Sequence, residues 1–151
     1  MITFKGRHHQ QDIILQCVRW YVAYSLSYRD LEELMQERGY AVDHSTVQRW
    51  VVHYAPRIEK AFRKNKKRVG LRWRLDETYV KIKGKWKYLN NIVEQDQRFI
   101  KRIIRPMLGF KSFWSARATL AGIELWRMLK KGQSKSSLPA WEQFYEIAAA
   151  G

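Results

Sequence analysis

The sequence predicts an α+β fold in which three helices come first and a strand hairpin separates them from further helices. Before residue 56, apolar residues recur every three or four positions in three segments, which is the spacing of helices with one buried face. Between Trp73 and Tyr88 the spacing changes to two, which indicates strands. With 151 residues, 46% of them hydrophobic, the chain has room for one ordinary domain or two small ones. We expect two small units.

The first two helices are defined by their apolar faces and by the residues at their ends. The first covers about residues 11 to 25. Ser27, with Asp30 three positions later, comes close to a capping box and is expected to begin the second helix. Gly39 supplies the left-handed conformation that ends a helix at low cost. The apolar stripes consist of Ile14, Cys17, Val18, Tyr21 and Val22 in the first helix and of Leu31, Leu34 and Met35 in the second.

A third helix is expected to begin after the cap Asp43. Three short helices with a tight glycine turn between the second and the third are typical of a helix-turn-helix. Gln and Arg pair bidentately with adenine and guanine edges, so Gln48 and Arg49 are the best candidates for base contact. A small helical bundle with a solvated polar face is the alternative. The buried stripe of this helix consists of Val47, Trp50, Val51 and Tyr54, and its outer face of Ser45, Gln48, Arg49, Val52 and His53.

The chain is strongly basic, with 29 Lys and Arg against 14 Asp and Glu and a net charge of +15. A polyanion offsets such a charge, and the phosphate backbone of a nucleic acid is the commonest one. A ribosomal or RNA-binding protein would fit the charge equally well. Pro56 is expected to begin a basic linker helix that contacts phosphates, the alternative being a solvated linker. Its cations are Arg57, Lys60, Arg63, Lys64, Lys66, Lys67 and Arg68.

Several classes of protein are excluded. Cys17 is the only cysteine, so neither a disulfide framework nor a thiolate zinc site can form. No apolar run approaches the roughly 18 residues of a membrane span, and the first residues contain no hydrophobic signal core. We therefore expect a cytoplasmic bacterial protein, associated with the nucleoid and without a membrane partner.

The second half of the chain begins with a predicted hairpin. Lys83-Gly84-Lys85 is a turn signal between two alternating runs, which predicts a strand pair with one apolar face formed by Val80, Ile82, Trp86 and Tyr88. Helical spacing then extends from Asn91 to Arg105. Ser112 is expected to cap a long helix to about Lys131 that buries Phe113, Leu120, Leu125, Trp126 and Leu129. Residues 132 to 138 form a predicted link, and Pro139 begins a short terminal helix.

Two carboxylates are candidates for chemistry. Asp76 follows the hydrophobic run 73–75 next to the hairpin, and carboxylates at strand ends can hold Mg²⁺, which prefers oxygen ligands. Glu94 begins a helical stripe that continues with Arg98, Lys101 and Arg105, an arrangement suited to a metal beside a nucleic-acid backbone. The alternatives are an edge-strand acid facing solvent at Asp76 and a solvated face with ion pairs at Glu94.

The order of these motifs resembles that of transposases of the IS-six group over nearly the whole chain. The N-terminal region is similar in Phe4-Lys5-Gly6-Arg7-His8, Val18-Arg19-Trp20-Tyr21, Leu26-Ser27-Tyr28-Arg29-Asp30-Leu31-Glu32, Val42-Asp43-His44-Ser45-Thr46-Val47 and Tyr54-Ala55-Pro56. The segments that carry the first catalytic Asp and the catalytic Glu of that group are similar to residues 73–86 and to residues 87–96 with 101–111.

This resemblance implies a DDE transposase with an RNase H-like catalytic domain, in which two Asp and one Glu hold two Mg²⁺ ions that activate water or a DNA 3′-hydroxyl for attack on a phosphodiester. Asp76 would be the first Asp and Glu94 the Glu, both as metal ligands. Lys101 matches the basic residue that contacts DNA ends in the family.

The match departs from the family at the second catalytic Asp. In the family this Asp lies well upstream of the Glu, in a long stretch of strands and helices, whereas here Asp76 and Glu94 are only 18 positions apart and no residue between them can take its place. The Lys-Tyr-Leu-like run that the family has twice occurs once, at Lys87–Leu89, so we hypothesise an internal deletion fused at that run. The resemblance therefore implies a truncated RNase H-like domain, with the paired Mg²⁺ site incomplete and strand cleavage lost.

The predicted units are a helix-turn-helix at 1–55, a basic linker helix at 56–71, a truncated catalytic domain at 72–131 and a C-terminal tail with a short helix at 132–151. The expected partner is double-stranded DNA at the terminal repeats of an insertion sequence, with a homodimer or a mixed dimer with full-length transposase. Three alternatives stay open. They are an active enzyme that recruits its missing Asp from a partner chain, a non-enzymatic regulator of transposition, and an unfolded product.

Overall fold

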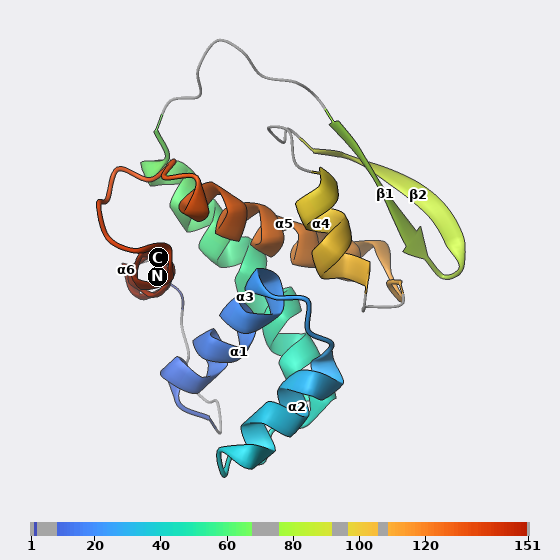
Figure 1. Ribbon diagram of the computed structural model, residues 1–151, viewed down its shortest axis with the longest axis horizontal. Helices are drawn as coiled ribbons and strands as arrows, with labels where there is room; N and C mark the ends of the chain where they lie inside the picture. Colours follow the sequence, from blue (N-terminus) through green and yellow to red (C-terminus); the bar gives the residue numbers. More distant parts are fainter. Residues whose placement is uncertain (1, 3–8, 68–75, 92–96, 106–108, 151) are drawn as a thin grey trace.

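The computed structural model describes residues 2, 9–67, 76–91, 97–105 and 109–150, and only the backbone at 65, 76–80, 88–91 and 97–99. This part of the chain consists of helices and a single pair of antiparallel strands, which lies at the edge of the molecule, so the expected α+β class is confirmed (Figure 1). The elements are α1 (Gln11–Ala23), α2 (Tyr28–Glu37), α3 (His44–Asn65), β1 (Asp76–Ile82), β2 (Lys85–Asn91), α4 (Gln97–Ile104), α5 (Phe113–Lys130) and α6 (Ala140–Ala150).

The ends of the first helices form as their sequence predicts. Ser27 caps α2 in a complete capping box, in which its Oγ accepts from the backbone N–H of Asp30 at 3.2 Å and its own N–H donates to Asp30 Oδ2 at 2.6 Å. Gly39 follows α2 with a φ of +81°, in the left-handed region where a side chain is costly. Asp43 caps α3 by accepting from the N–H of Ser45 at 3.1 Å. These local contacts bring α3 back against α2.

The expected new helix at Pro56 is wrong, because α3 continues through this residue as one helix of 22 residues. Proline has a φ suited to a helix but no N–H to donate to the carbonyl of Val52, one turn earlier. The buried stripe of α3 continues past it with Ala55, Ile58 and Phe62, all fully buried. Packing of this stripe offsets the lost hydrogen bond, so the basic segment is a rigid extension of the third helix.

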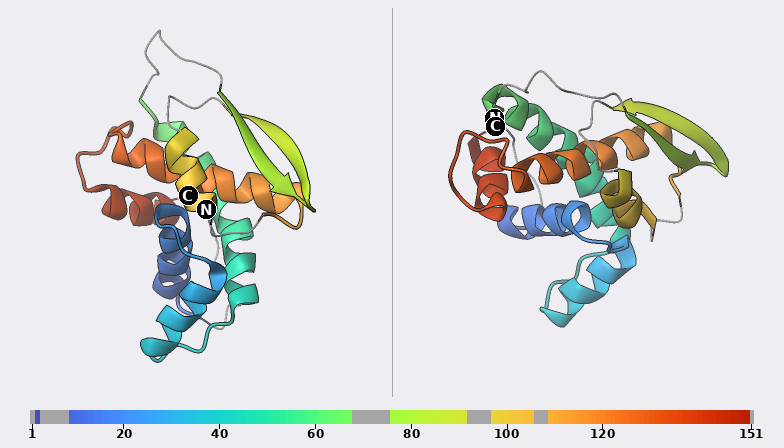
Figure 2. Two further views of the ribbon diagram at one scale, coloured as in Figure 1. Left: turned by 45° about the vertical axis from the view of Figure 1, so that its right-hand side comes forward. Right: turned by 45° about the horizontal axis from the view of Figure 1, so that its top comes forward.

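One hydrophobic core joins the helices, with side chains from α1, α2, α3, α4, α5 and α6. Helix α5 crosses α3 at the centre of the molecule, and both views in Figure 2 show this crossing, with α6 near the C-terminal end of α5. At the crossing Gly122 lies so close to α1 and α3 that an added Cβ would be 2.6 Å from Val22 Cγ1 and 2.9 Å from Ala55 Cβ. The N-terminal helices and the helices that follow the hairpin therefore share their core. The division into four units stays a prediction.

The hairpin has the expected turn but not the expected faces. Lys83 and Gly84 have φ values of 48° and 78°, which is typical of a two-residue type I′ turn. This turn pairs Ile82 with Lys85 and Lys81 with Trp86. Because paired residues share a face and neighbours alternate, Ile82 and Trp86 lie on opposite faces. Ile82 is buried while Trp86 is 68% exposed. The prediction that both residues belong to one apolar face of the hairpin is therefore wrong at its turn end.

The later helices agree with the sequence except at the start of α4 and in the exposure of Phe113. Asn91, expected in a helix, is the last residue of β2, and the described helix α4 begins at Gln97. Ser112 caps α5 as predicted, accepting from the N–H of Ser115 at 3.1 Å. Phe113 was expected in the core but is 48% exposed, because it lies in the first turn of α5, beyond the crossing with α3. Helix α6 follows Pro139. None of the helices described is both long and apolar enough to span a membrane.

A carboxylate lies at the interface between α3 and α5. Burial raises the pKa of Glu124 on α5 to about 7; the cations Arg63 and Lys66 oppose this rise and the charge of Glu59 adds to it. Glu59 is itself 9% exposed and forms an ion pair with Arg63. Glu124 Oε1 is buried without a hydrogen-bond partner among the described atoms. Ionisation of Glu124 is therefore costly in the folded state.

We expect Glu124→Gln to stabilise the protein at pH 8 and to leave it nearly unchanged at pH 4.5. The pKa of Glu124 in the folded state lies above its ordinary value of 4.5. Its neutral form therefore contributes fully to stability below pH 4.5, and this contribution is lost as the pH rises to about 7. The gain at pH 8 should be about 2 kcal/mol after allowance for partial exposure. Urea unfolding at both pH values measures it. Glu146→Gln, on the exposed face of α6, is the matched control, and equal pH slopes for both variants would contradict the expectation.

Candidate nucleic-acid interface

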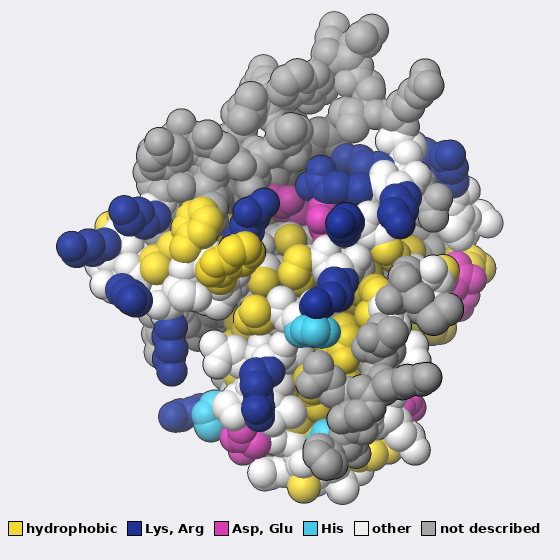
Figure 3. Space-filling view, turned by 180° about the vertical axis from the view of Figure 1, so that it is seen from behind, with side chains coloured by type: hydrophobic (Ala, Val, Ile, Leu, Met, Phe, Trp, Pro, Cys, Tyr) yellow, Lys and Arg dark blue, Asp and Glu magenta, His cyan; other side chains and the backbone are white. Residues whose placement is uncertain are grey.

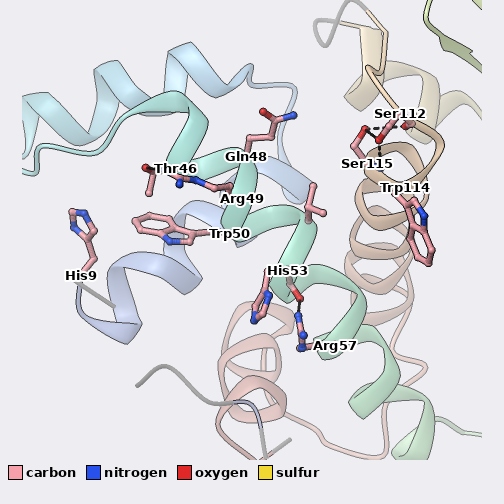
Figure 4. A pocket seen from close by; sticks show the side chains of 11 residues that line it. His9, Thr46, Gln48, Arg49, Trp50, His53, Arg57, Ser112, Trp114 and Ser115 are labelled. Atoms are coloured by element: carbon pink, nitrogen blue, oxygen red, sulfur yellow. Dashed lines mark hydrogen bonds between the residues drawn. The ribbon is translucent and has the colours of Figure 1, made fainter. Parts of the chain in front are cut away.

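The first half of α3 exposes the side chains predicted to contact bases (Figure 4). Arg49 is exposed and donates one N–H to Thr46 Oγ1 at 2.9 Å, which orients the guanidinium and leaves its other donors available. Gln48 is half-buried, and Ser45 is exposed with its hydroxyl donating to Asp43. Val52 and His53 lie one turn further on and are half-buried. The predicted outer face of the helix is thus accessible, with Ser45 and Arg49 exposed.

A groove of about 860 Å³ runs beside this face, and we call it the α3–α5 groove. One wall is formed by α3, including Gln48, Arg49 and Arg57. The other is formed by the N-cap and first turn of α5, and there Trp114 is 72% exposed (Figure 4). Trp114 was not among the residues predicted from the sequence for a site. Its place at the start of a capped helix, outside the apolar stripe, was the available signal.

A second hollow of about 480 Å³ lies on the other side of Gln48. Its lining includes Arg29, His44 and Lys111. Gln48 therefore lies between two hollows, both lined by residues at the start of α5 or just before it. The surroundings of the predicted reading helix are built by both halves of the chain.

The predicted phosphate-contacting residues extend along the second half of α3. Arg57, Lys60 and Lys64 are exposed, and Arg57 donates to the carbonyl of His53. The ion pair with Glu59 partly neutralises Arg63. Of the remaining cations, Lys66 is half-buried in a β-bridge with Ser134, Lys67 is exposed with its Nζ donating to the carbonyl of Gly132 at 3.2 Å, and Arg68 lies outside the described residues.

On the described part of the face shown in Figure 3, Lys and Arg side chains outnumber those of Asp and Glu. Hydrophobic side chains lie between these cations. A surface of this kind attracts the phosphate backbone without regard to sequence. On α3 itself, Gln48 and Arg49 are followed by the exposed cations Arg57, Lys60 and Lys64, so groups suited to base edges and groups suited to phosphates occur on one helix.

The predicted catalytic residues are described only in part. Asp76 is the first residue of β1, and its backbone pairs with Asn91, three positions before Glu94 in the sequence. Glu94 lies outside the described residues, so its distance from Asp76 and their joint role as metal ligands stay predictions. Lys101 is exposed on α4.

The predicted metal site falls outside the described part of the chain, since neither the side chain of Asp76 nor Glu94 is described. Among the described side chains, one group of three is close enough to share an ion, and it consists of Glu32, Asp43 and His44. In this group His44 Nδ1 lies 2.9 Å from Glu32 Oε2 and 3.0 Å from Asp43 Oδ1. The hydroxyl of Ser45 lowers the pKa of the Asp43 carboxyl by hydrogen bonding. An imidazole nitrogen suits Mg²⁺ poorly, so we assign these three residues to fastening α2 to the start of α3.

Comparison with known proteins agrees with the resemblance in the sequence. Residues 87–133 match a family model described as a DDE domain. The transposase for insertion sequence-like element IS431mec from Staphylococcus aureus strain Mu50 is 45% identical over 96 residues, which are 64% of this chain and 43% of that protein. The transposase for insertion sequence element IS257 in transposon Tn4003, also from Staphylococcus aureus, is 44% identical over the same shares.

The chain spans less than half of the length of these curated relatives. No solved structure matches it significantly. The matched DDE segment contains all of α5, the helix that packs on α3 and forms one wall of the groove. Over 96 residues the sequence of this chain is thus similar to transposases of insertion sequences, and its residues 87–133 are similar to a DDE domain.

Proposed function

We propose that this chain binds the terminal inverted repeats of an insertion sequence through a helix-turn-helix formed by α2 and α3. The observation that carries the proposal is the position of Gln48 and Arg49 on the accessible half of α3, at the α3–α5 groove, in a chain related to transposases. Arg recognises guanine and Gln recognises adenine through paired hydrogen bonds in the major groove. These two side chains would select the sequence.

The continuation of α3 past Pro56 supports a second role for the same helix. Arg57, Lys60 and Lys64 are exposed about two to four turns beyond Arg49 on a rigid helix. Cations in such positions contact phosphates, which sets the register of the protein on the duplex but does not read bases. Non-specific affinity and its salt dependence would come mainly from this half of α3.

A salt-series binding assay tests this proposal. The purified chain is titrated with a duplex that carries the terminal repeats of a related element and with a shuffled duplex of equal length. We expect the preference for the repeats to persist as salt weakens both affinities, because hydrogen bonds to base edges are less sensitive to salt than phosphate contacts. Equal affinities throughout the series would overturn sequence-specific binding.

We further propose that the chain does not cleave or join DNA strands. The family reaction uses divalent metal ions held by three carboxylates, and between Asp76 and Glu94 the sequence has no candidate for the second Asp. The DDE match begins at Lys87, at the run where we place the fusion. Incubation of the purified chain with repeat-bearing DNA and Mg²⁺ should yield no nicked or joined product. Joined product that disappears in Asp76→Asn would overturn the proposal.

A second candidate function is inhibition of transposition. A chain that keeps the reading helix and a shared core with α5, but spans less than half of its relatives, would occupy the repeats or form mixed dimers without reacting. Co-expression with an intact transposase of the same element should lower its transposition frequency, and Arg49→Ala should restore it if occupancy is the cause. Inhibition that survives Arg49→Ala would indicate mixed dimers instead.

A further inference from the structure

We infer that the tip of the β1–β2 hairpin is a second DNA-contacting element, which holds the phosphate backbone beside the bases read by α3. This inference rests on the proposed function, because it assumes that the chain binds duplex DNA. It gives a role to a surface that contains neither the predicted metal ligands nor the reading helix. We call residues 81–87 the hairpin tip.

The hairpin tip has an unusual density of positive charge. Its sequence, Lys-Ile-Lys-Gly-Lys-Trp-Lys, contains four lysines and no acid. All four lysines are exposed, and Trp86 between them is 68% exposed. Lysine is a compact charge on a flexible stem that suits phosphate oxygens better than base edges. An exposed aromatic ring beside such cations can pack against sugar and base surfaces.

The register distributes these lysines around the tip. Lys85 is paired with Ile82 on one face, Lys81 is paired with Trp86 on the other, and Lys83 is in the turn. A two-stranded ribbon is narrow enough to enter or follow a DNA groove. With cations on both faces and at the turn, the tip can contact phosphates on either side of such a groove.

The hairpin tip is anchored to the helical body. The N–H of Phe110 donates to the carbonyl of Lys81 at 2.8 Å, and the N–H of Lys83 donates to the carbonyl of Phe110 at 3.0 Å. Ile82 is buried at this bridge. Gly109 makes the approach possible, since its φ is +97° and an added Cβ would be 3.1 Å from the carbonyl oxygen of Lys81. The position of the hairpin tip is therefore fixed by backbone hydrogen bonds to Phe110.

This anchor also sets the position of the tip relative to the reading helix. Phe110 lies two residues before Ser112, the N-cap of α5, and Ser112 lines the α3–α5 groove opposite Arg49 and Arg57. Phe110 itself lines the second hollow together with Gln48. A duplex seated against Gln48 and Arg49 would meet the start of α5 next, and the hairpin tip is bonded directly to that segment.

The double variant Lys85→Gln/Lys87→Gln tests the inference in the full chain. Both residues are exposed, and neither provides a backbone bond to Phe110. We expect weaker binding to repeat-bearing and shuffled DNA alike, with the slope of log affinity against log salt reduced by about 1 to 2, since each phosphate contact on B-DNA contributes about 0.9. The ratio of the two affinities should be unchanged, because phosphate contacts do not read sequence.

The matched control is Lys131→Gln/Lys135→Gln, which removes the same charge at the other end of α5, about 27 Å from its N-cap along the helix. An equal change of slope in both double variants would mean that only net charge matters and would overturn the inference. If the wild-type chain prefers the repeats while Lys85→Gln/Lys87→Gln keeps its full slope, the hairpin inference fails and the proposed function stands. If the wild-type chain binds no DNA, both fail.

A position-specific probe gives a second measurement. Cys17 is fully buried, so a thiol introduced as Lys85→Cys can be labelled selectively with a DNA-cleaving iron chelate. We expect backbone cleavage on one side of the bases protected by α3. The same label at Lys135→Cys should give no cleavage near those bases, and equal cleavage patterns from the two positions would contradict the inference.

Discussion

Gly122→Val is expected to lower the free energy of unfolding of the whole chain by about 3 kcal/mol. A Cβ at this position would lie 2.6 Å from Val22 Cγ1 and 2.9 Å from Ala55 Cβ, and both neighbours are fully buried. Neither atom can move cheaply, since the Val22 side chain is stiff and the Ala55 Cβ moves only with the backbone of α3. Valine adds two further methyl groups, so α5 must shift away from α1 and α3.

Urea unfolding, followed both by far-UV circular dichroism and by tryptophan fluorescence, measures this effect. Ala121→Val on the same helix is the matched control, because Ala121 is half-exposed and its replacement should cost less than about 1 kcal/mol through helix propensity. Both probes should shift together in Gly122→Val, because one core joins α1, α3 and α5. A separate transition, in which the N-terminal helices keep their stability, would show that the two parts fold independently.

Replacing the side chains that we propose to read bases should have the largest effect on function. Arg49→Ala and Gln48→Ala are each expected to reduce the preference for repeat-bearing over shuffled DNA by roughly 5- to 150-fold, which corresponds to about 1–3 kcal/mol for one bidentate pair. Affinity for shuffled DNA should fall much less. Competition binding at a fixed salt concentration measures the ratio.

Two variants make this prediction sharper. Arg49→Lys keeps the charge but not the planar fork of donors, so it should lose the preference while it keeps the salt slope of the wild-type chain. Lys64→Ala should weaken binding to both duplexes by the same factor and lower the slope by about 0.9. A preference that survives in Arg49→Lys would indicate that Arg49 contacts phosphate, and the reading role would then pass to other residues of α3.

The placement of α5 changes what the second half of the chain contributes. The sequence resemblance describes this half as part of a catalytic domain, whereas the structure packs its long helix into the core of the N-terminal helices and places its first turn beside Gln48. Removing this helix would expose Val22 and Ala55 and would open one wall of the α3–α5 groove. Helix α3 thus depends on the second half of the chain for its support.

Features set by neighbours in the sequence could be predicted. The capping box of Ser27 and Asp30, the cap at Asp43, the left-handed Gly39 and the turn at Lys83–Gly84 all form as expected, because each depends on bonds or steric limits within a few residues. The apolar stripe of α3 was predicted for the same reason. Periodicity reports which face is buried whatever covers it.

Other features depended on contacts that periodicity does not contain. Pro56 was expected to begin a helix, but burial of Ile58 and Phe62 against the rest of the core keeps α3 continuous. Trp86 was placed on an apolar face, and the two-residue turn puts it on the face opposite Ile82. The exposure of Phe113 and Trp114 was not predicted. It depends on where α5 crosses α3, because the first turn of α5 lies beyond this crossing and outside the core.

By itself, the sequence determined the α+β class and the ends of most helices, because these depend on local bonds. It also determined the net charge of +15, the residues proposed on α3 for base reading and the similarity to transposases, because these depend on composition and residue identity. Only the tertiary structure decided that α5 seals the core of the N-terminal helices at Gly122 and that the lysines of the hairpin tip are tied to the segment beside Gln48. Both arrangements join residues far apart in the chain. Close packing and backbone hydrogen bonds between such residues leave no periodic signal in a single sequence.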